Sequence, residues 1–583
     1  MSELFSGGFY VHKIPLVRTN RRSFNDKGRA SVSAADLDSV NRVQATPWRV
    51  NQFILDLQTK AFADRTSLPG VPLELPITPL GSPSYEAWRD SLRTGRRHRA
   101  MSDTTWEALT DEQRKEHKST MAGIYDHNAK VVGRKFAFMD LISVAQELRN
   151  ERAVYFPHNR CFRGRIYPAI NSGPHPQASD VGKGGIHFAE GKKLGSLGYF
   201  WLLVRLANCA GKDKMTLNER VSWALDHKDQ VRDSAAHPEE CLWWAEVNGG
   251  DEAWSLLATC HELNLAWSSG NPEDFISHLP VPMDGTCNGL QHLSALALDP
   301  IGAAATNLSA RNTRQDIYID VGQSVRERVL SDASQGISEA LEWEPRMGDT
   351  GFLRSLVKRA VMTTPYGVTA RGIRTQILND DAIMGGISEG KGKAAEYIRG
   401  HIMGALEGTA GAAQGVMGYL RECASELAKA GVPFSWQTPS GSVIEQAYRE
   451  PVQHRVPTLC GHLVVYDESD AQPLSVRKQA AGAPPNYVHS FDGAHLSMTV
   501  NKAFNQGIRS FAMIHDSYGT HAADTQTLAR SLRESFVEIY QQDRLAQTAS
   551  EIADYAPHVY LPEPPKRGAF DINEVLRSEF FFS

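Results

Sequence analysis

The sequence predicts an α+β fold that is rich in helices. The first indication is that long segments of helical periodicity alternate with short strand-and-turn segments. The helical segments lie near residues 85–152, 190–275 and 311–430, and the strand-and-turn segments lie near 154–187, 279–292 and 436–478. The second indication is that the strands come in separate groups, whereas a doubly wound sheet would place one strand before each helix. A chain of 583 residues exceeds one small core, so roughly two to four subdomains are expected.

The composition excludes several classes of protein. Apolar residues make up 41% of the chain and charged residues 22%, which is typical of a globular protein. The seven cysteines include no C-x-x-C pair, so we expect a reducing compartment without a structural zinc site or a disulfide framework. No apolar run reaches membrane-spanning length and the first residues lack a signal-peptide core, so we expect a soluble cytosolic protein. The net charge of −5 does not exclude a nucleic-acid partner, because a positive channel can lie inside an acidic body.

The first 150 residues are basic in places and interrupted by prolines. A helix-like run extends from Asp36 to Lys60, and the proline-rich stretch 68–79 is typical of a linker. A basic group then precedes a long helical segment, and it consists of Arg93, Arg96, Arg97, His98 and Arg99. Two interpretations of this group stay open: a grip on a phosphate backbone, or a solvated loop in front of packed helices.

The segment 436–478 predicts β-hairpins. We expect the run from Cys460 to Tyr466 to pair with Pro473 to Arg477 across an acidic turn.

One short stretch predicts a polyphosphate site. Arg354 and Lys358 are four residues apart, so on a helix both stand on one face. Two stacked cations on a rigid helix suit a triphosphate. Pro365 should bend or end this helix, which sets Tyr366 at its lip, where the ring can meet a base. The alternative is an ordinary pair of solvated surface charges.

Two aspartates are candidates for metal binding. Asp284 ends an apolar, proline-stiffened segment, and Asp516 follows the apolar segment that begins at Phe511. A carboxylate at the tip of a buried strand is unfavourable unless it binds a cation or a partner. Two such carboxylates brought together would hold a pair of Mg²⁺ ions about 4 Å apart for in-line phosphoryl transfer. Each aspartate alone is also compatible with a turn or a helix cap, and the dipeptide His515-Asp516 alone is weak support for a metal phosphohydrolase.

With these residues in view, the chain resembles the single-subunit DNA-dependent RNA polymerases of T7-type bacteriophages, which are relatives of mitochondrial RNA polymerase. The matching motifs follow the family's order and cover nearly the whole chain. They are Phe156-Pro, Arg163-Gly-Arg165-Ile-Tyr167, Ala207-Asn-Cys-Ala-Gly211 with Lys214, Asp284-Gly with Gly289-Leu-Gln-His292, Gln315-Asp-Ile-Tyr318, Arg354-x3-Lys358-x7-Tyr366-Gly367, Pro485-Asn-Tyr-Val-His489-Ser-x-Asp492-Gly493 and Ile514-His-Asp516-Ser517.

The resemblance implies a right-hand polymerase fold with thumb, palm and fingers. The expected parts are an N-terminal remnant and linker at 1–67, a thumb at 68–150, a discontinuous palm at 151–189, 275–300 and 490–583, a palm insertion at 190–274, and fingers at 301–489 with a specificity-type hairpin near 455–478.

The resemblance also implies roles for single residues. Asp284 and Asp516 would hold the two Mg²⁺ ions, with the Gly285 carbonyl as a further ligand. Arg354 and Lys358 would bind the incoming triphosphate, and Lys358 would also protonate or neutralise the pyrophosphate.

Other positions are expected to contact the nucleotide or the strands. Lys214 would lie near the outer phosphates, Tyr318 by the nucleotide and template base, and Tyr366 would help to read the ribose 2′-hydroxyl. His489 would lie by the primer terminus, while Arg163 and Arg165 would hold the RNA and template strands. The aromatic tail Phe580 to Ser583 would tuck back toward the active site.

The resemblance has departures. Cys161 stands where the family usually has an aspartate, and Pro365 replaces a small residue before the tyrosine. The chain begins where the family's N-terminal promoter-binding domain is almost finished, so we expect intact catalysis and leave initiation open. Three explanations remain: a separate subunit supplies the missing half, the enzyme starts on single-stranded or pre-melted template, or the sequence is a shortened form.

The expected activity is DNA-templated RNA synthesis, with DNA template, RNA product and NTPs as partners. A phage-encoded enzyme would act in the cytoplasm of the bacterial host, with mitochondria as the less favoured site. One alternative is a family A-like DNA polymerase, but the stretch after Asp284 up to His292 lacks the carboxylate that would block a ribose. The other is a non-catalytic nucleic-acid-binding relative, which would be expected to lose these charged residues first.

Overall fold

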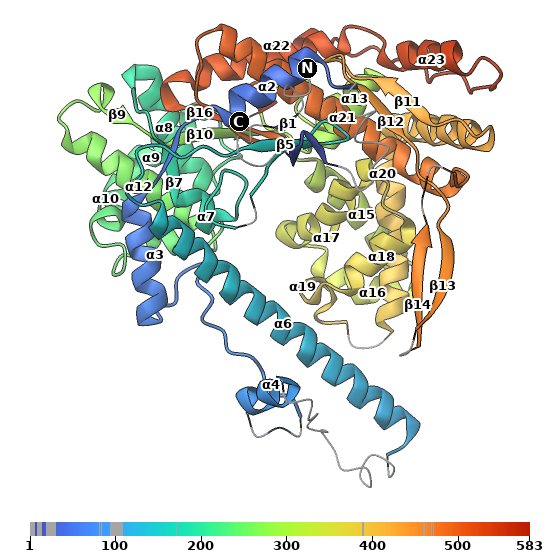
Figure 1. The fold of residues 1–583 in the computed structure, drawn as a ribbon, viewed down its shortest axis with the longest axis horizontal. Coiled ribbons are helices and arrows are strands. Elements are labelled where there is room, and N and C mark those ends of the chain that lie inside the picture. Colours follow the sequence, from blue (N-terminus) through green and yellow to red (C-terminus); the bar gives the residue numbers. More distant parts are fainter. Residues whose placement is uncertain are drawn as a thin grey trace.

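Helices dominate the chain and the strands form small separate sheets, as the computed structural model of the protein shows (Figure 1). The predicted helix-rich α+β fold is confirmed. The structure describes residues 6–7, 14–18, 31–80, 82, 84–93, 109–170, 172–387, 390–458, 461–467, 469 and 471–582.

The region before residue 190 contains one very long helix, α6, among shorter elements. In order, the elements are β1 (Ser6–Gly7), β2 (Ile14–Pro15), β3 (Val17–Arg18), α2 (Ala34–Gln44), β4 (Trp48–Val50), α3 (Gln52–Asp64), α4 (Tyr85–Arg93), α6 (Asp111–Glu147), β5 (His158–Cys161), β6 (Ile166–Pro168), α7 (Asp180–Gly184) and β7 (Ile186–Phe188). The helix-like run predicted for 36–60 is therefore wrong as one element, because β4 separates two helices. Pro47 precedes that strand and does not suit a helix interior.

The next region carries most of the helices that surround the site. The elements are β8 (Lys192–Lys193), α8 (Gly195–Cys209), α9 (Leu217–Asp226), α10 (Lys228–Ala236), α11 (Trp243–Glu246), α12 (Ala253–Ser268), η1 (Pro272–Asp274), β9 (Ile276–Ser277), β10 (Pro280–Asp284), α13 (Asn288–Ala297), α14 (Pro300–Ala305), α15 (Ile317–Ser334), α16 (Ser338–Trp343), η2 (Glu344–Arg346), α17 (Thr350–Thr363), η3 (Thr364–Tyr366), α18 (Ala370–Leu378), α19 (Asp381–Met384) and α20 (Lys391–Lys429).

The last region returns to the centre of the molecule. The elements are β11 (Phe434–Gln437), β12 (Val443–Gln446), β13 (Val452–Thr458), β14 (Gly461–Asp467), α21 (Val476–Asn505), β15 (Ala512–Ile514), β16 (Ser517–His521), η4 (Ala522–Asp524), α22 (Thr525–Tyr540), α23 (Arg544–Tyr555) and η5 (Ile572–Arg577).

A three-stranded antiparallel sheet, in the order β10-β16-β15, lies at the centre of the candidate site. The residues of β10 alternate between the core and the open face, because successive strand residues point to opposite sides. Val281 and Met283 are buried, whereas Pro282 and Asp284 are exposed on the other face. The sheet therefore presents Asp284 on an open face while its back is anchored in the core.

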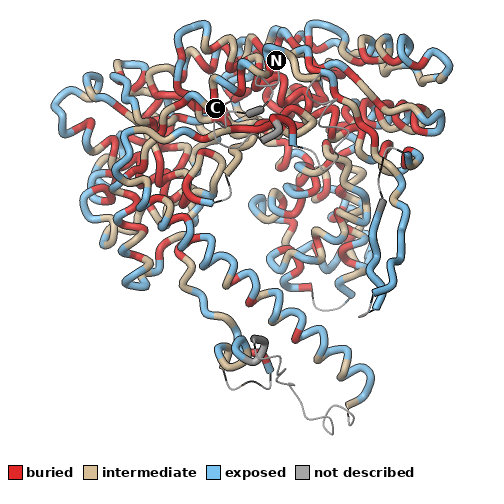
Figure 2. The backbone as a smooth tube through the Cα atoms, in the orientation of Figure 1, coloured by how far each residue is buried: buried red, intermediate tan, exposed pale blue. Residues whose placement is uncertain are grey.

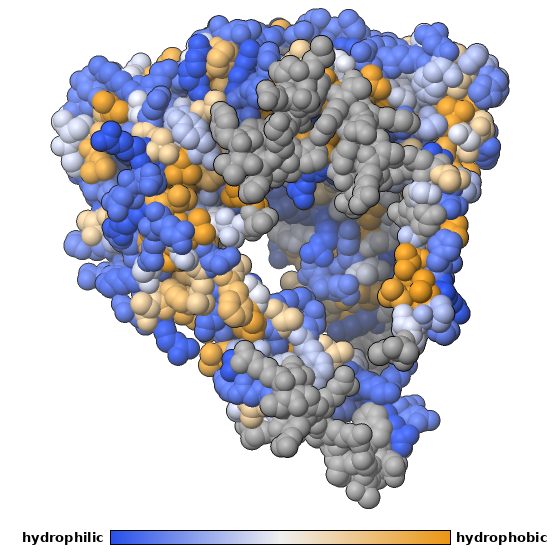
Figure 3. Space-filling model, viewed as in Figure 1, coloured by the Kyte–Doolittle hydropathy of each residue, from blue (hydrophilic) through white to orange (hydrophobic). Residues whose placement is uncertain are grey.

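Packed helices surround this sheet and one helix extends away from it. Helix α21 packs against α2, α13, α20 and α22, and α15 packs against α17 and α20. Figure 2 shows that buried residues concentrate in the body, whereas α6 and the β13–β14 hairpin are mostly exposed. The face seen in Figure 3 is hollowed between the part that carries α3 and α7 and the part that carries α15 to α19.

The hairpin predicted near 455–478 differs in its pairing. β14 pairs with β13, with Val456 opposite Leu463, so the predicted pairing of the 460–466 run with 473–477 is wrong. The later segment instead begins α21, whose first turn is capped by the Ser475 side chain accepting from the Lys478 amide.

Among the described residues, the search for a helix both long and apolar enough to cross a membrane finds none.

Candidate active site

The two candidate aspartates lie on neighbouring strands of the central sheet. Asp284 is the last residue of β10 and stands opposite Ser517, the first residue of β16. Asp516 directly precedes Ser517 in the two-residue turn that joins β15 to β16, and the other turn residue, His515, has a left-handed backbone with φ of 45°. Because paired residues of antiparallel strands lie about 5 Å apart, this register brings the two carboxylate-bearing residues together.

Both carboxylates resist ionisation in the metal-free protein. Burial raises the pKa of Asp516 to about 6, and the nearby charges of Asp492 and Asp284 add to the shift. Burial also raises the pKa of Asp284, although its side chain opens onto a pocket; the nearby Ser517 acts in the opposite direction. Neither aspartate forms an ion pair within the described ranges of the chain, so a bound cation would stabilise the ionised form of both.

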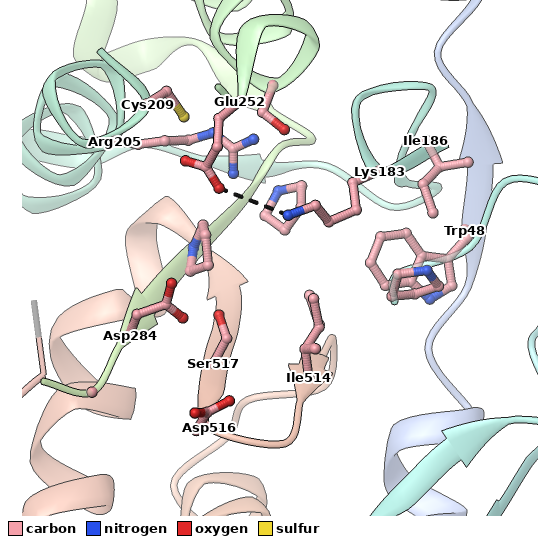
Figure 4. Close-up of a pocket in the computed structure, with 16 residues that line it drawn as sticks. Trp48, Lys183, Ile186, Arg205, Cys209, Glu252, Asp284, Ile514, Asp516 and Ser517 are labelled. Carbon is pink, nitrogen blue, oxygen red and sulfur yellow. Dashed lines mark ion pairs between the residues drawn. The ribbon is translucent and has the colours of Figure 1, made fainter. Parts of the chain in front are cut away.

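The open face of the sheet lines a pocket of about 340 Å³ (Figure 4). One end holds Asp284 and Asp516, and the other end holds Lys183 and Glu252, which form an ion pair of 3.7 Å. Most of the remaining lining is apolar and comes from Trp48, Pro176, Ile186, Pro280, Pro282, Ala512 and Ile514, and Arg205 adds a charge. The carboxylates are thus accessible from the pocket, as a metal-binding pair must be.

The predicted cationic helix is confirmed as α17. Its buried residues follow a helical spacing, namely Leu353, Leu356, Val357, Ala360 and Val361. Arg354 and Lys358 therefore share the opposite side, where Lys358 is exposed and Arg354 is half-buried. The helix ends at Thr363, and a 3₁₀ turn that contains Pro365 leads to Gly367 at φ of 77°.

The structure brings three predicted nucleotide-binding residues together around an aspartate that sequence reasoning missed. The Asp316 Oδ2 atom lies 2.9 Å from Arg354 Nε and 3.6 Å from Lys214 Nζ. On its other side, the Arg354 guanidinium lies 5.1 Å from the centre of the Tyr318 ring. Asp316 belongs to the Gln315-Asp-Ile-Tyr318 motif, and its position just before a helix was the available signal, since aspartate is a common N-cap.

The cationic cluster is linked to the aspartate strand. The Tyr318 side chain lies beside Cys287, three residues after Asp284, and the two groups act electrostatically on each other. The ion pair of Asp213 with Arg314, beside Lys214 and Asp316, acts electrostatically on Asp284. The cations and the carboxylates therefore belong to one site.

Tyr366 and His489 form a stacked pair at the lip of α17. The His489 Nδ1 atom lies 2.8 Å from Arg163 Nη1, which can only donate, so His489 accepts there and is neutral. Burial and the charges of Arg165 and Arg163 lower the pKa of His489 to about 3, while burial raises the pKa of Tyr366 to about 12. Both rings are therefore uncharged near neutral pH and act by contact and hydrogen bonding.

Arg165 is held by a second aspartate that sequence reasoning did not assign. Arg165 Nε donates to Asp492 Oδ2 at 2.6 Å, and Asn288 Nδ2 donates to the other oxygen at 2.8 Å. Burial opposes the ionisation of Asp492, but Arg165 holds its pKa below the usual range. The ion pair requires close approach of α21, because a Cβ at Gly493 would lie 2.8 Å from the Gly164 carbonyl carbon.

The C-terminal aromatic residues pack behind the aspartate strand. Phe580, Phe581 and Phe582 are buried, and Phe582 forms an isolated antiparallel bridge with Gly285. Arg533, for which the sequence held no signal, donates to the carbonyls of Ser578, Glu579 and Phe582 at 3.0 to 3.3 Å. Arg96 and Arg97 lie outside the described residues.

The donor set fits magnesium better than softer metals. The described part of the chain contains no group of three His, Cys, Asp or Glu side chains that could hold a metal. Two carboxylates with a neighbouring backbone carbonyl at Gly285 offer only hard oxygen ligands, and Mg²⁺ is usually held by one or two carboxylates together with water and substrate phosphates. Carboxylates beside a cation-bearing helix are typical of the class of enzymes that act on polyphosphate substrates with metal ions.

Comparison with known proteins identifies the family. The profile described as DNA-dependent RNA polymerase matches residues 192–561. The chain belongs to this family, as the predicted resemblance to single-subunit RNA polymerases indicated.

Its relatives include plant organellar enzymes. DNA-directed RNA polymerase 2B, chloroplastic/mitochondrial, of Nicotiana tabacum is 33% identical over 588 residues, which cover 98% of this chain and 54% of the relative. DNA-directed RNA polymerase 2, chloroplastic/mitochondrial, of Arabidopsis thaliana is 37% identical over 453 residues, covering 76% and 44%. The chain thus spans about half the length of the curated relatives it matches. Among solved structures, the POL domain of Pol1 from M. smegmatis aligns with a TM-score of 0.39 and 12% identity over 88% of this chain and 67% of that chain.

Proposed function

We propose that the chain catalyses DNA-templated RNA synthesis, in which an RNA 3′-hydroxyl attacks the α-phosphate of an NTP and pyrophosphate leaves. The observation that carries this proposal is the pairing of Asp284 with Ser517, which sets Asp284 beside Asp516. Electrostatic contacts of Cys287 with Tyr318, and of Asp284 with Asp213 and Arg314, connect this strand end to the Arg354 cluster. Membership of the RNA polymerase family supports the same reaction.

Asp284 and Asp516, with the Gly285 carbonyl, are the residues that would hold two Mg²⁺ ions. When bound, these ions supply positive charge for the attacking hydroxyl and for the leaving pyrophosphate. Arg354, Lys214 and Lys358 bind the triphosphate, because guanidinium and ammonium groups pair with phosphate oxygens. Lys358 is exposed and has no ion-pair partner among the described residues, so it is available to neutralise or protonate the pyrophosphate.

We propose that uncharged aromatic rings contact the sugar and the base of the nucleotide. Tyr366 and His489 stack at the lip of α17, and we assign to them the ribose and the primer terminus, with Tyr318 beside Arg354. The segment between Asp284 and His292 contains no carboxylate, which leaves room for a 2′-hydroxyl. These features favour ribonucleotides over deoxyribonucleotides.

We also assign the residues that bind the nucleic-acid strands and the parts of the chain that form thumb, palm and fingers. Arg163 and Arg165, backed by His489 and Asp492, hold the RNA and template near the carboxylates. We assign the long α6 segment of 68–150 to the thumb, 301–489 to the fingers, and the segments around β10, β15 and β16 to the palm, with 190–274 as an insertion. The exposed β13–β14 hairpin is assigned to promoter reading, and Arg96 and Arg97 to the strand backbone.

The proposed partners follow from the reaction. DNA template, RNA product and NTPs are the proposed partners, and a separate promoter-melting factor is a further proposal. The named relatives act in chloroplasts and mitochondria, so the phage origin and host-cytoplasm location stay predictions.

The test supplies all four ribonucleotides and Mg²⁺ with an RNA primer annealed to a DNA template, which removes any need for promoter opening. The wild-type protein should extend the primer, whereas Asp516→Asn should lose at least about a thousandfold in rate. Asp554→Asn, at an exposed position on α23, makes the same chemical change away from the site and should retain activity. Equal inertness of wild type and Asp516→Asn would favour a binding protein, and preferred use of dNTPs would favour a DNA polymerase.

A further inference from the structure

We infer that Asp316 is a positioning residue that orients Arg354 and Lys214 for the outer phosphates of the incoming nucleotide. The inference rests on the proposed function and assigns a role to a side chain that binds neither metal nor base. Three sets of contacts support it.

The carboxylate of Asp316 is itself held by the backbone. Its Oδ1 atom accepts from the backbone amides of Tyr318 at 3.0 Å and Ile319 at 3.4 Å, which makes Asp316 the N-cap of α15. The positive end of the helix favours a negative charge at this position. Burial opposes ionisation, but the hydrogen bond and charge of Arg354, together with the charge of Lys214, hold the pKa of Asp316 below its usual value.

The second oxygen of Asp316 sets the orientation of the guanidinium. Arg354 donates to Oδ2 through Nε, at 2.9 Å, and not through its two terminal nitrogens. The carbon of the same guanidinium lies over the Tyr318 ring, 5.1 Å from its centre. The guanidinium is thus held by Asp316 at its Nε and by the Tyr318 ring, while its terminal nitrogens can pair with phosphate oxygens in a fork.

The same oxygen holds Lys214 near Arg354. An anion between two cations offsets their mutual repulsion. Lys214 Nζ lies 3.6 Å from Oδ2, with 52% of its side chain exposed. The neighbouring pair has reversed charges, since Arg314 donates to Asp213 Oδ2 at 2.6 Å. Two ion pairs therefore join the loop of Lys214 to the start of α15. Of the residues in these pairs, Asp316 is the one that also contacts α17.

The capping role of Asp316 can be separated from its charge. Asparagine caps a helix about as well as aspartate, so Asp316→Asn keeps the cap and removes the anion. Asp349 caps α17 through the amides of Gly351 and Phe352 and contacts neither Arg354 nor Lys214, so Asp349→Asn is a matched control on the helix that carries Arg354.

The experiment measures the KM for NTP, the kcat and the inhibition constant of pyrophosphate on a primed RNA–DNA template. Asp316→Asn should raise the KM and the pyrophosphate inhibition constant together, each by roughly tenfold, with kcat changed by less than about threefold. Asp349→Asn should match the wild type, and Asp316→Asn should add little to Arg354→Met. A helix-cap role alone would leave both constants unchanged.

An unchanged or lower KM in Asp316→Asn, or the same change in both variants, would overturn the inference. Failure of the proposed function has a different signature, because the wild type would then not extend the primer. In that case calorimetric titration with ATP and Ca²⁺ decides: weaker binding by Asp316→Asn than by Asp349→Asn supports the positioning role, and equal binding or none in the wild type rejects it.

Discussion

The Tyr366 ring stacks on the His489 imidazole, with ring centroids 4.6 Å apart and planes inclined by 24°. Tyr366 lies in the turn after α17 and His489 lies in α21, so this contact joins the two segments at the place proposed for the ribose. Because both rings stay uncharged near neutral pH, this contact depends on packing rather than on ionisation.

The stacked pair gives the first prediction. His489→Ala removes a contact of about 1 kcal/mol and frees the Tyr366 ring, so the KM for NTP should rise roughly fivefold and ribose selection should weaken. His489→Phe keeps the stacking and should retain most of the affinity. Single-nucleotide incorporation with rNTP and dNTP measures both effects, and an Ala variant with wild-type selection would contradict the proposed contact.

Metal binding should appear as a change in stability. Because burial raises the pKa of Asp516 to about 6, its ionised form destabilises the metal-free fold at pH 8. Asp516→Asn should therefore be about 1–3 kcal/mol more stable than the wild type without Mg²⁺. Added Mg²⁺ should raise the Tm of the wild type and leave that of Asp516→Asn unchanged. Thermal melts with EDTA and with Mg²⁺ test this, and equal Mg²⁺ shifts would exclude Asp516 as a ligand.

Gly493 should tolerate no side chain. A Cβ there would lie 2.8 Å from the Gly164 carbonyl carbon and 2.9 Å from its oxygen, and both are backbone atoms. Gly493→Ala should therefore lower the free energy of unfolding by about 2–4 kcal/mol and weaken the Arg165–Asp492 pair. Gly418→Ala is the control, because nothing lies within 4 Å of its Cβ in helix α20. Urea unfolding should show that this control is slightly stabilised.

Acid should destabilise the protein through its buried histidines. Burial lowers their pKa values to between about 3 and about 4 in the cases of His158, His187, His292, His489, His495 and His515. The unfolded chain, with histidine pKa values near 6.5, then binds protons more readily, so stability is retained above that pH and lost as pH falls toward 4.

Urea midpoints between pH 8 and pH 5 measure this loss. His292→Gln should make the pH dependence shallower, and His237→Gln, at an exposed position, should leave it unchanged. A wild-type midpoint that stays constant down to pH 5 would contradict the buried neutral state.

Arg533 should secure the C-terminal segment. Arg533→Met removes donors to the Ser578 and Phe582 carbonyls, so unfolding should become easier by about 2–3 kcal/mol. Carboxypeptidase should then trim the chain near Phe582 faster. Arg530→Met, on the same helix, is the comparison, and equal trimming of the two variants would argue against the proposed anchoring role.

Local patterns predicted the parts of the site that depend on local chemistry. The spacing of Arg354 and Lys358 and the position of Pro365 were enough to predict α17 and its end, because helix periodicity and proline geometry act within a few residues. The strand-end position of Asp284 and Asp516 was visible for the same reason. Their adjacency is a long-range pairing, which only the structure gives.

The parts that could not be predicted depend on partners far away in the chain. The predicted partner of the 461–467 strand was wrong, because the segments before and after this strand have similar strand propensity. The later segment forms a helix capped by Ser475, which leaves the earlier segment to pair with the strand. Asp316 and Asp492 looked like ordinary capping or turn aspartates, and their cationic partners come from other elements. The six predictions for Arg163, Arg165, Lys214, Tyr318, Tyr366 and His489 stay predictions of role, although the structure gathers these residues around two aspartates.

The bridge between Gly285 and Phe582 has a consequence for biosynthesis. The hydroxyl of Thr286 donates to the carbonyl of Phe580, a residue 294 positions later, and β10 has no sheet partner until β16 has been made. A ribosome releases residues in order, so β10 would emerge with Val281 and Met283 uncovered and would wait for most of the remaining chain. During translation the apolar side of this segment would be open to chaperones, and Asp284 would come to lie beside Asp516 only after β16 has been made.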